Sequence, residues 1–227
     1  MKSWTVTLAL AVTVSVAQAH SLKGLEDQLG DREQYFQVVE KQAPDFALRD
    51  AEGTPIKLSD LRGKVAVLHF IYTQCPDLCP LHAEKIAEVQ AMINRTPMKD
   101  QVRFVTITTD PMHDTVDVMR AYGPTHGLDP INWIFLTARD DQDEDATRKL
   151  AERFGHTFTK ADDGYQMHGV VTHVIDREGR WRANFHGLKF GSTNLVLYVN
   201  ALVNDHDRHD VAPATERSLW SRLREIF

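Results

Sequence analysis

The two cysteines of the chain, Cys75 and Cys79, lie together in the hexapeptide Cys-Pro-Asp-Leu-Cys-Pro. Two thiols this close can form a disulfide, or they can hold a soft metal ion as a pair of thiolates. Three residues separate them, against two in the common Cys-x-x-Cys redox motif, and the wider spacing leaves room for a metal ion. The pair therefore predicts redox or metal chemistry at this point of the chain.

The elements around the motif place both thiols at one end of a predicted sheet. Residues 65–72 form a continuous apolar run, which is typical of a strand buried on both faces. Apolar residues then recur at helical spacing over 78–93. Cys75 should therefore lie in the loop after the strand and Cys79 in the first helical turn, where the helix dipole favours a thiolate.

Histidine and methionine are the other soft or borderline ligands to consider. His82 follows Cys79 by three residues and can share a helix face with it, whereas His69 lies inside the apolar run and should be a core residue. Met167 stands next to His168, ahead of the predicted strand 170–176. His206 and His209 belong to a charged stretch that should face solvent.

The remaining pattern predicts an α/β fold in which a central mixed sheet is flanked by helices. The expected elements are a hairpin over 44–58, strands at 102–108, 133–136, 170–176 and 181–185, and helices at 114–122, 140–154 and 195–203. Asp110 ends a neighbouring strand at the edge where α/β sites gather, so it is a candidate for tuning or docking; otherwise it caps the next turn.

The two ends of the chain differ from its middle. Residues 1–19 read as an export signal, with an uncleaved membrane anchor as the alternative, and 20–41 as a lead-in segment before a domain at 42–204. Residues 205–227 should form a charged linker and a C-terminal amphipathic helix that either contacts a membrane or packs on the domain. The net charge of −6 disfavours a nucleic-acid partner.

Several of these motifs occur in an order that resembles the Sco/SenC family over about residues 41–204. The matching segments are Leu58-x-Asp60-Leu61-x-Gly63-Lys64, Tyr72-Thr73-x-Cys75-Pro76-Asp77-x-Cys79-Pro80, Asp110-Pro111-x-x-Asp114-Thr115, and His168 before Val174-Ile175-Asp176. The resemblance implies a thioredoxin-like fold and one copper ion, as Cu(I) or Cu(II), held by Cys75, Cys79 and His168.

The resemblance also implies a role in maturing the binuclear copper centre of cytochrome c oxidase. The expected partners are the copper-accepting oxidase subunit and, as further candidates, other copper chaperones or thioredoxin-like reductants. The alternative is a thiol–disulfide oxidoreductase that reduces a partner's cysteines through the redox pair Cys75 and Cys79. Two residues depart from the family pattern: His113 stands where arginine is usual, and His173 replaces an aromatic or aliphatic residue.

Overall fold

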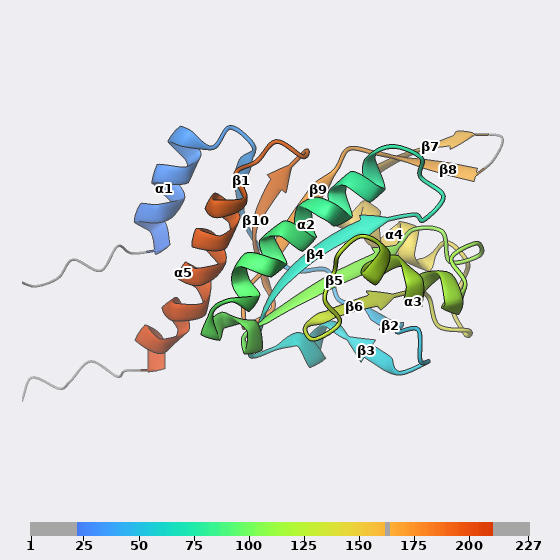
Figure 1. The fold of residues 1–227 in the computed structure, drawn as a ribbon, viewed down its shortest axis with the longest axis horizontal. Helices are drawn as coiled ribbons and strands as arrows, with labels where there is room; N and C mark the ends of the chain where they lie inside the picture. The colour runs from blue at the N-terminus through green and yellow to red at the C-terminus, as the bar shows by residue number, and fades with distance from the viewer. Residues whose placement is uncertain (1–21, 162–163, 211–227) are drawn as a thin grey trace, which may run out of the picture.

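The computed structural model describes residues 22–161 and 164–210 of the chain (Figure 1). Its helices are α1 (Leu22–Arg32), η1 (Leu58–Leu61), α2 (Leu78–Asn94), η2 (Pro97–Asp100), α3 (Val116–Thr125), α4 (Ala146–Arg153) and α5 (Ser192–Asp210). Its strands are β1 (Phe36–Gln42), β2 (Ala47–Arg49), β3 (Pro55–Lys57), β4 (Val65–Ile71), β5 (Val102–Thr108), β6 (Trp133–Leu136), β7 (Thr157–Ala161), β8 (Gly164–His168), β9 (Val171–Ile175) and β10 (Arg180–His186).

A six-stranded mixed sheet in the order β1-β10-β9-β4-β5-β6 forms the centre of the molecule. The strands β4, β5 and β6 run parallel, whereas β9 pairs antiparallel with β4 and with β10. One face of the sheet packs against α1, α2, α3 and α5, and the other against α4 and the short hairpin β2–β3. The predicted α/β sandwich is therefore confirmed, with its most buried strand, β4, at the centre.

The lead-in segment predicted for residues 20–41 is instead part of the folded domain. It holds α1 and the edge strand β1, which pairs antiparallel with β10. A register shift between Val38 and Lys41 surrounds Glu40, which has a φ of 51°. Charged residues and a bulge are common on exposed edge strands, and they weaken the alternation that sequence analysis relies on.

A second hairpin, formed by β7 and β8, also differs from expectation. Its strands pair only with each other, in a register that sets Thr157 opposite His168. The sequence analysis places no strand at 157–168, because a polar two-stranded hairpin outside the main sheet shows no strong apolar period. His168 therefore ends a strand of its own rather than merely preceding β9.

Helix boundaries shift at two acidic stretches. Residues 205–210, predicted as a linker, continue α5 to Asp210, because no glycine or proline interrupts the segment and charged side chains are compatible with an exposed helix. Residues 140–145 form turns before α4 rather than its first turns.

The export signal predicted at 1–19 and the amphipathic helix predicted at the C-terminal end of the chain lie outside the described residues. Within 22–161 and 164–210, the helices fall short of the length and apolarity that a bilayer crossing needs.

Candidate metal and thiol site

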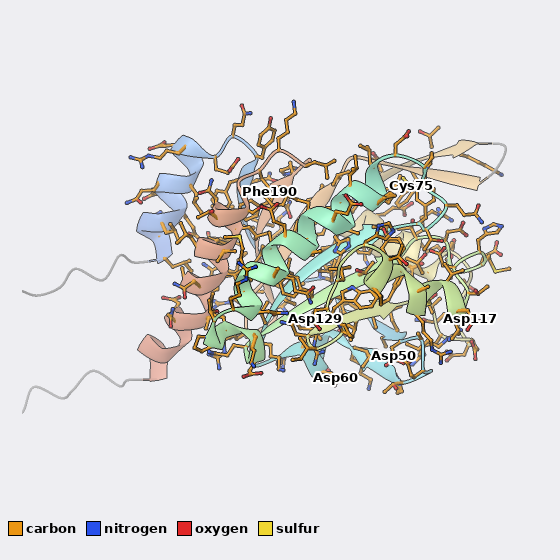
Figure 2. The ribbon with its side chains drawn as sticks, viewed as in Figure 1. Asp50, Asp60, Cys75, Asp117, Asp129 and Phe190 are labelled. Atoms are coloured by element: carbon orange, nitrogen blue, oxygen red, sulfur yellow. The ribbon has the colours of Figure 1, made fainter. Side chains whose placement is uncertain are left out.

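The loop that carries Cys75 is a tight connection between β4 and α2 (Figure 2). The backbone N–H of Cys75 donates to the carbonyl of Tyr72 at 3.1 Å, which folds the loop back after the strand. Asp77 occupies the N-cap position of α2, but its side chain makes no capping hydrogen bond. The Cys75 sulfur takes that role, because it accepts the N–H of Cys79 at 3.4 Å.

The two thiols differ sharply in burial and in pKa. Burial alone would raise the pKa of Cys75, but hydrogen bonds from the Cys79 thiol and from the N–H groups of Cys79, Asp77 and Leu78 outweigh it and lower the pKa. Cys79 is only 4% exposed, and burial, its hydrogen bond to Cys75 and the charges of Cys75 and Asp114 raise its pKa strongly. Both cysteines are free, and their pKa values are shifted in opposite directions, so Cys75 is the more readily deprotonated of the two.

A buried carboxylate, Asp114, anchors the start of this loop to the neighbouring strand. It accepts hydrogen bonds from the backbone N–H and the hydroxyl of Thr73, and from the hydroxyl of Thr108 at the end of β5. Burial and the charge of Asp110 raise the pKa of Asp114, although the bonds from Thr108 and Thr73 lower it. The carboxylate therefore fixes the loop from behind, on the side away from solvent.

Tyr122 supports Cys79 from α3. Its hydroxyl donates to the Cys79 carbonyl at 3.1 Å, and the side chain is almost fully buried. Burial, together with the charges of Cys79 and Cys75, raises the pKa of Tyr122, which keeps the hydroxyl protonated as a donor. The first turn of α2 is thus fixed by α3 as well as by its own backbone.

Asp110 lies at the surface beside this anchor rather than in it. Its carboxylate pairs with His113 Nδ1 at 2.8 Å, and its carbonyl accepts the N–H of Asp114 at 3.1 Å. His113 is thus an exposed hydrogen-bond partner of Asp110, at the position where arginine is usual in the family pattern. The carbonyl of Asp110 therefore forms the turn before α3, whereas its carboxylate bonds the His113 ring rather than a backbone N–H, and the tuning or docking role stays a prediction.

The backbone brings His168 to the same end of the sheet as the cysteine loop. His69 of β4 pairs antiparallel with Thr172 of β9, so the end of β4 and the start of β9 lie together. The β7–β8 hairpin leads directly into β9 at this end (Figure 1). The His168 side chain lies outside the description, whereas Met167 is half-buried and packs against the core on the α4 side. Among the described side chains, three or more metal-binding residues do not come together.

His82 and His69 form a buried pair beneath α2. Their rings lie 4.8 Å apart, His82 Nε2 hydrogen bonds to Thr172 Oγ1 at 2.8 Å, and His69 Nε2 to Thr106 Oγ1 at 3.2 Å. Burial lowers the pKa of His69 to about 3, and burial with the neighbouring histidines lowers the pKa of His82. The expected core position of His69 is confirmed, and His82 joins it there.

His173 and His156 form a second buried pair on the other face of the sheet. Asn184 Oδ1 accepts from Trp181 Nε1, so His173 Nδ1, 2.8 Å away, must be a donor to the same oxygen. His173 Nε2 then accepts from His156 Nε2 at 2.9 Å, and the buried Nδ1 of His156 carries a lone pair without a partner. Both rings are neutral, and burial lowers the pKa of His156 to about 4. His173 is therefore a buried core residue with both ring nitrogens hydrogen bonded.

Sequence reasoning identified the cysteine loop but missed two residues that hold it. Asp114 and Tyr122 were assigned only to the opening and the end of a helix, whereas both contact the loop. The Asp-Pro-x-x-Asp spacing was the available signal for Asp114, because it sets a second carboxylate one turn after the strand end.

Comparisons with known proteins agree with this geometry. The sequence matches SCO1/SenC over residues 34–202. A SCO2-like protein of Rickettsia prowazekii is 31% identical over 143 residues, which cover 62% of this chain and 67% of that protein.

Two solved structures share the fold. Bradyrhizobium japonicum ScoI with copper bound is 26% identical, with a TM-score of 0.59 over 70% of this chain and 98% of that one. BsSco, a Sco family cytochrome c oxidase assembly protein with an identified disulfide switch, is 18% identical, with a TM-score of 0.65 over 74% and 96%. Because the family match spans most of the described domain, the chain belongs to the SCO1/SenC family.

Proposed function

We propose that this protein is an exported copper metallochaperone that binds one copper ion through Cys75, Cys79 and His168. Its role is to assist maturation of the binuclear copper centre of cytochrome c oxidase, with the copper-accepting oxidase subunit as its partner. The observation that carries the proposal is the pair of free thiols held together at the start of α2, where hydrogen bonds lower the pKa of Cys75. The copper-bound relative and the oxidase assembly relative support it.

The donor set fits copper as cargo. Two thiolates suit soft Cu(I), and an added imidazole lets the same site accept Cu(II). Hydrogen bonds favour deprotonation of Cys75 and burial opposes it at Cys79, so at least Cys79 should lose a proton on metal binding, and loading should release protons. Transfer would proceed by exchange of these ligands for those of the acceptor.

Export is part of the proposal and rests on the sequence of residues 1–19. An exported location would place the thiols where disulfides can form. A reductant, such as a thioredoxin-like protein, would then be needed to keep Cys75 and Cys79 able to take up copper.

The asymmetry of the two thiols favours a second candidate, a thiol–disulfide oxidoreductase. Half-buried Cys75 would attack a partner's disulfide as a thiolate and form a mixed disulfide, releasing one partner thiolate. Cys79 would then give up its proton and displace the second partner thiolate, leaving a Cys75–Cys79 disulfide. Two electrons pass to the partner, and a reductant must restore the dithiol. The disulfide switch identified in BsSco supports this reading.

An anaerobic copper titration of the reduced full chain separates the two functions. We expect one tightly bound copper, with sulfur-to-copper charge-transfer bands in the Cu(II) form. Cys75→Ser should weaken binding by about a thousandfold or more, and His168→Ala should weaken Cu(II) binding by about a hundredfold. His113→Ala is the matched control, since His113 is exposed on the neighbouring loop and should leave binding unchanged.

Two results would overturn the copper proposal. Unchanged Cu(II) binding in His168→Ala would remove His168 from the ligand set. Absence of tight binding in the unmodified chain, with Cys75 and Cys79 cycling between dithiol and disulfide and reducing a partner disulfide, would assign the protein to the oxidoreductases.

A further inference from the structure

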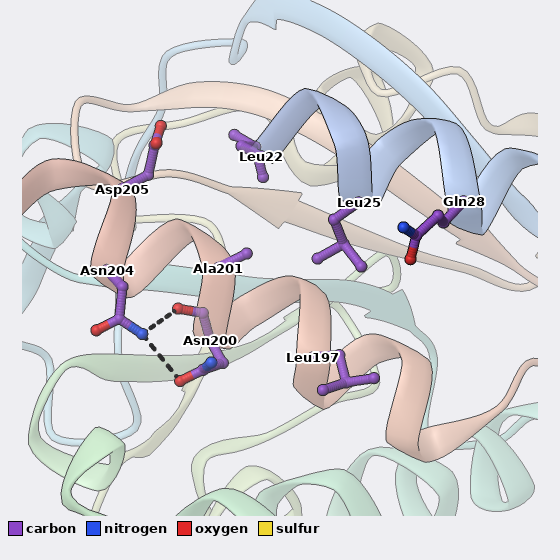
Figure 3. A pocket seen from close by; sticks show the side chains of 8 residues that line it. All are labelled: Leu22, Leu25, Gln28, Leu197, Asn200, Ala201, Asn204 and Asp205. Carbon is purple, nitrogen blue, oxygen red and sulfur yellow. Dashed lines mark hydrogen bonds between the residues drawn. The ribbon is translucent and has the colours of Figure 1, made fainter. Parts of the chain in front are cut away.

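A groove of about 310 Å³ opens between the first and last helices of the domain, far along the chain from the cysteines (Figure 3). Its apolar lining comes from Leu22 and Leu25 of α1 and from Leu197 and Ala201 of α5. Leu197 is 47% exposed, although the rest of its helix contributes a well-packed face to the core. A cavity half this size can hold a benzene ring, so the groove can take more than one large side chain.

One edge of the groove is polar. Asn204 Nδ2 donates to the carbonyl of Asn200 at 2.8 Å and to its side-chain oxygen at 3.1 Å, as the dashed lines in Figure 3 show. Asp205 continues this polar side along α5, and Gln28 of α1 lines the opposite end of the groove (Figure 3). An apolar floor with a polar, partly acidic edge is the form expected of a receptor for an amphipathic helix.

The sequence predicts such a helix in residues 219–227, which lie outside the described residues. In the C-terminal segment 219–227, four apolar side chains share one stripe at helical spacing: Leu219, Trp220, Leu223 and Phe227. Arg222 and Arg224 flank the stripe. The helix α5 contains three aspartates and one arginine, so the charges of the two segments are complementary.

The lengths of the segments fit each other. Along α5 the groove runs from Leu197 to Asp205, about 12 Å, and a helix over 219–227 is about 13 Å long. The end of α5 at Asp210 is about 8 Å beyond Asp205, and the eight residues 211–218 can reach about 26 Å when extended. The segment can therefore return antiparallel along α5.

We infer that residues 219–227 dock as an amphipathic helix into the groove between α1 and α5 of the same chain. Tethering favours this occupant over a free one, because a short linker gives an effective concentration on the order of millimolar. A groove affinity of only about 0.1 mM would then keep about ten of eleven tails docked. The inference is independent of the copper proposal, since α1 and α5 lie at the end of the molecule opposite to the cysteine loop (Figures 1 and 2).

Hydrogen–deuterium exchange on the full chain tests the docking reciprocally. Leu197→Gln removes an exposed groove side chain and should speed exchange of the amides of 219–227 by about tenfold. Leu223→Gln removes a stripe side chain and should speed exchange of the amides of α1. Leu81→Gln, at a leucine of similar exposure on α2, and Ser221→Asp, off the stripe, should change neither.

The other occupants are distinguished in the same experiment. Equal tail exchange in the unmodified chain and Leu197→Gln would overturn the inference. Protection of the tail that appears only with vesicles of anionic lipid would assign the stripe to a membrane surface. Protection that grows with protein concentration would assign the groove to a second copy of the chain. Either result would also contradict intramolecular docking.

Discussion

The cysteine loop and the β7–β8 hairpin are built in opposite ways, although both belong to the proposed copper site. The loop follows β4, whose residues are all buried, and Asp114 and Tyr122 hold it through hydrogen bonds from two neighbouring elements. The hairpin that ends at His168 pairs only with itself and contacts the core through Phe158 and Met167, which are half-buried. One half of the site is fixed by the core and the other is carried outside the main sheet.

This difference suits a protein that must both hold and release its cargo. A pre-formed thiol pair keeps affinity for copper, because little entropy is lost when the metal arrives. In the proposed site, the third ligand, His168, lies on a hairpin outside the sheet and would leave first, opening a coordination position for an acceptor. Each half also adjoins one buried histidine pair: His82, which pairs with His69, lies on α2 directly after the cysteine loop, and His156, which pairs with His173, directly precedes β7.

Acid should destabilise both halves of the proposed site together, because it lowers the unfolding free energy of the whole domain. This is the largest effect we expect. Burial lowers the pKa of His69 to about 3 and of His156 to about 4, from 6.5, so below pH 6.5 the unfolded chain binds protons that the folded chain excludes. Stability should be complete above pH 6.5 and fall by about 1.4 kcal/mol per pH unit for each of these histidines as pH drops toward 4. Urea unfolding between pH 7.5 and 4.5 measures it.

His156→Phe supplies the control for the acid effect. The raised pKa of Asp114 acts in the opposite direction, but it is common to both proteins and cancels in the comparison. Below pH 6.5, the slope of the unfolding free energy against pH should be about 1.4 kcal/mol per pH unit smaller in the variant. This change corresponds to one fewer proton bound on unfolding. An unchanged slope would mean that His156 is not excluded from protonation in the folded protein.

Removing the anchor of the cysteine loop should affect that half alone. Asp114→Ala leaves the Thr73 N–H and two hydroxyls without their acceptor in a buried place, which should cost about 2–4 kcal/mol of stability. Asp114→Asn should cost less. Asp117→Ala, at an exposed position on α3, is the matched control. Chemical denaturation measures the loss of stability, and the alkylation rate of Cys75 reports on the loop. Equal stability of Asp114→Ala and the control would show that Asp114 does not anchor the loop.

Weakening the packing of the β7–β8 hairpin should give the smallest loss of stability and leave the reactivity of the cysteines unchanged. Phe158→Ala removes a half-buried ring, so the loss should be about 1–2 kcal/mol, below the 3–5 typical of a fully buried phenylalanine. Copper affinity should fall about fivefold, while the alkylation rate of Cys75 stays constant. Lys160→Ala, exposed on the same strand, is the control. A parallel change in Cys75 reactivity would show that the two halves are one rigid unit.

The same contrast explains what the sequence could predict. The apolar run at 65–71 and the helical period after it specify the β4–α2 connection, because both elements are buried and their patterns are strong. The strands β1 and β7–β8 lie at an edge or outside the sheet, where solvent-facing polar residues blur the alternation. Asp114 bonds Thr73 and Tyr122 bonds Cys79 across 41 and 43 residues of the chain. A local hydrophobic pattern cannot predict contacts between residues so far apart.

X-ray absorption of the Cu(I) form of the full chain tests the two-part site most directly. Our account predicts two sulfur ligands and one nitrogen ligand in the unmodified protein, and two sulfurs alone after His168→Ala. His113→Ala should keep the nitrogen. A nitrogen that persists in His168→Ala, or a sulfur count above two that signals copper shared between chains, would contradict a site divided between the cysteine loop and the hairpin.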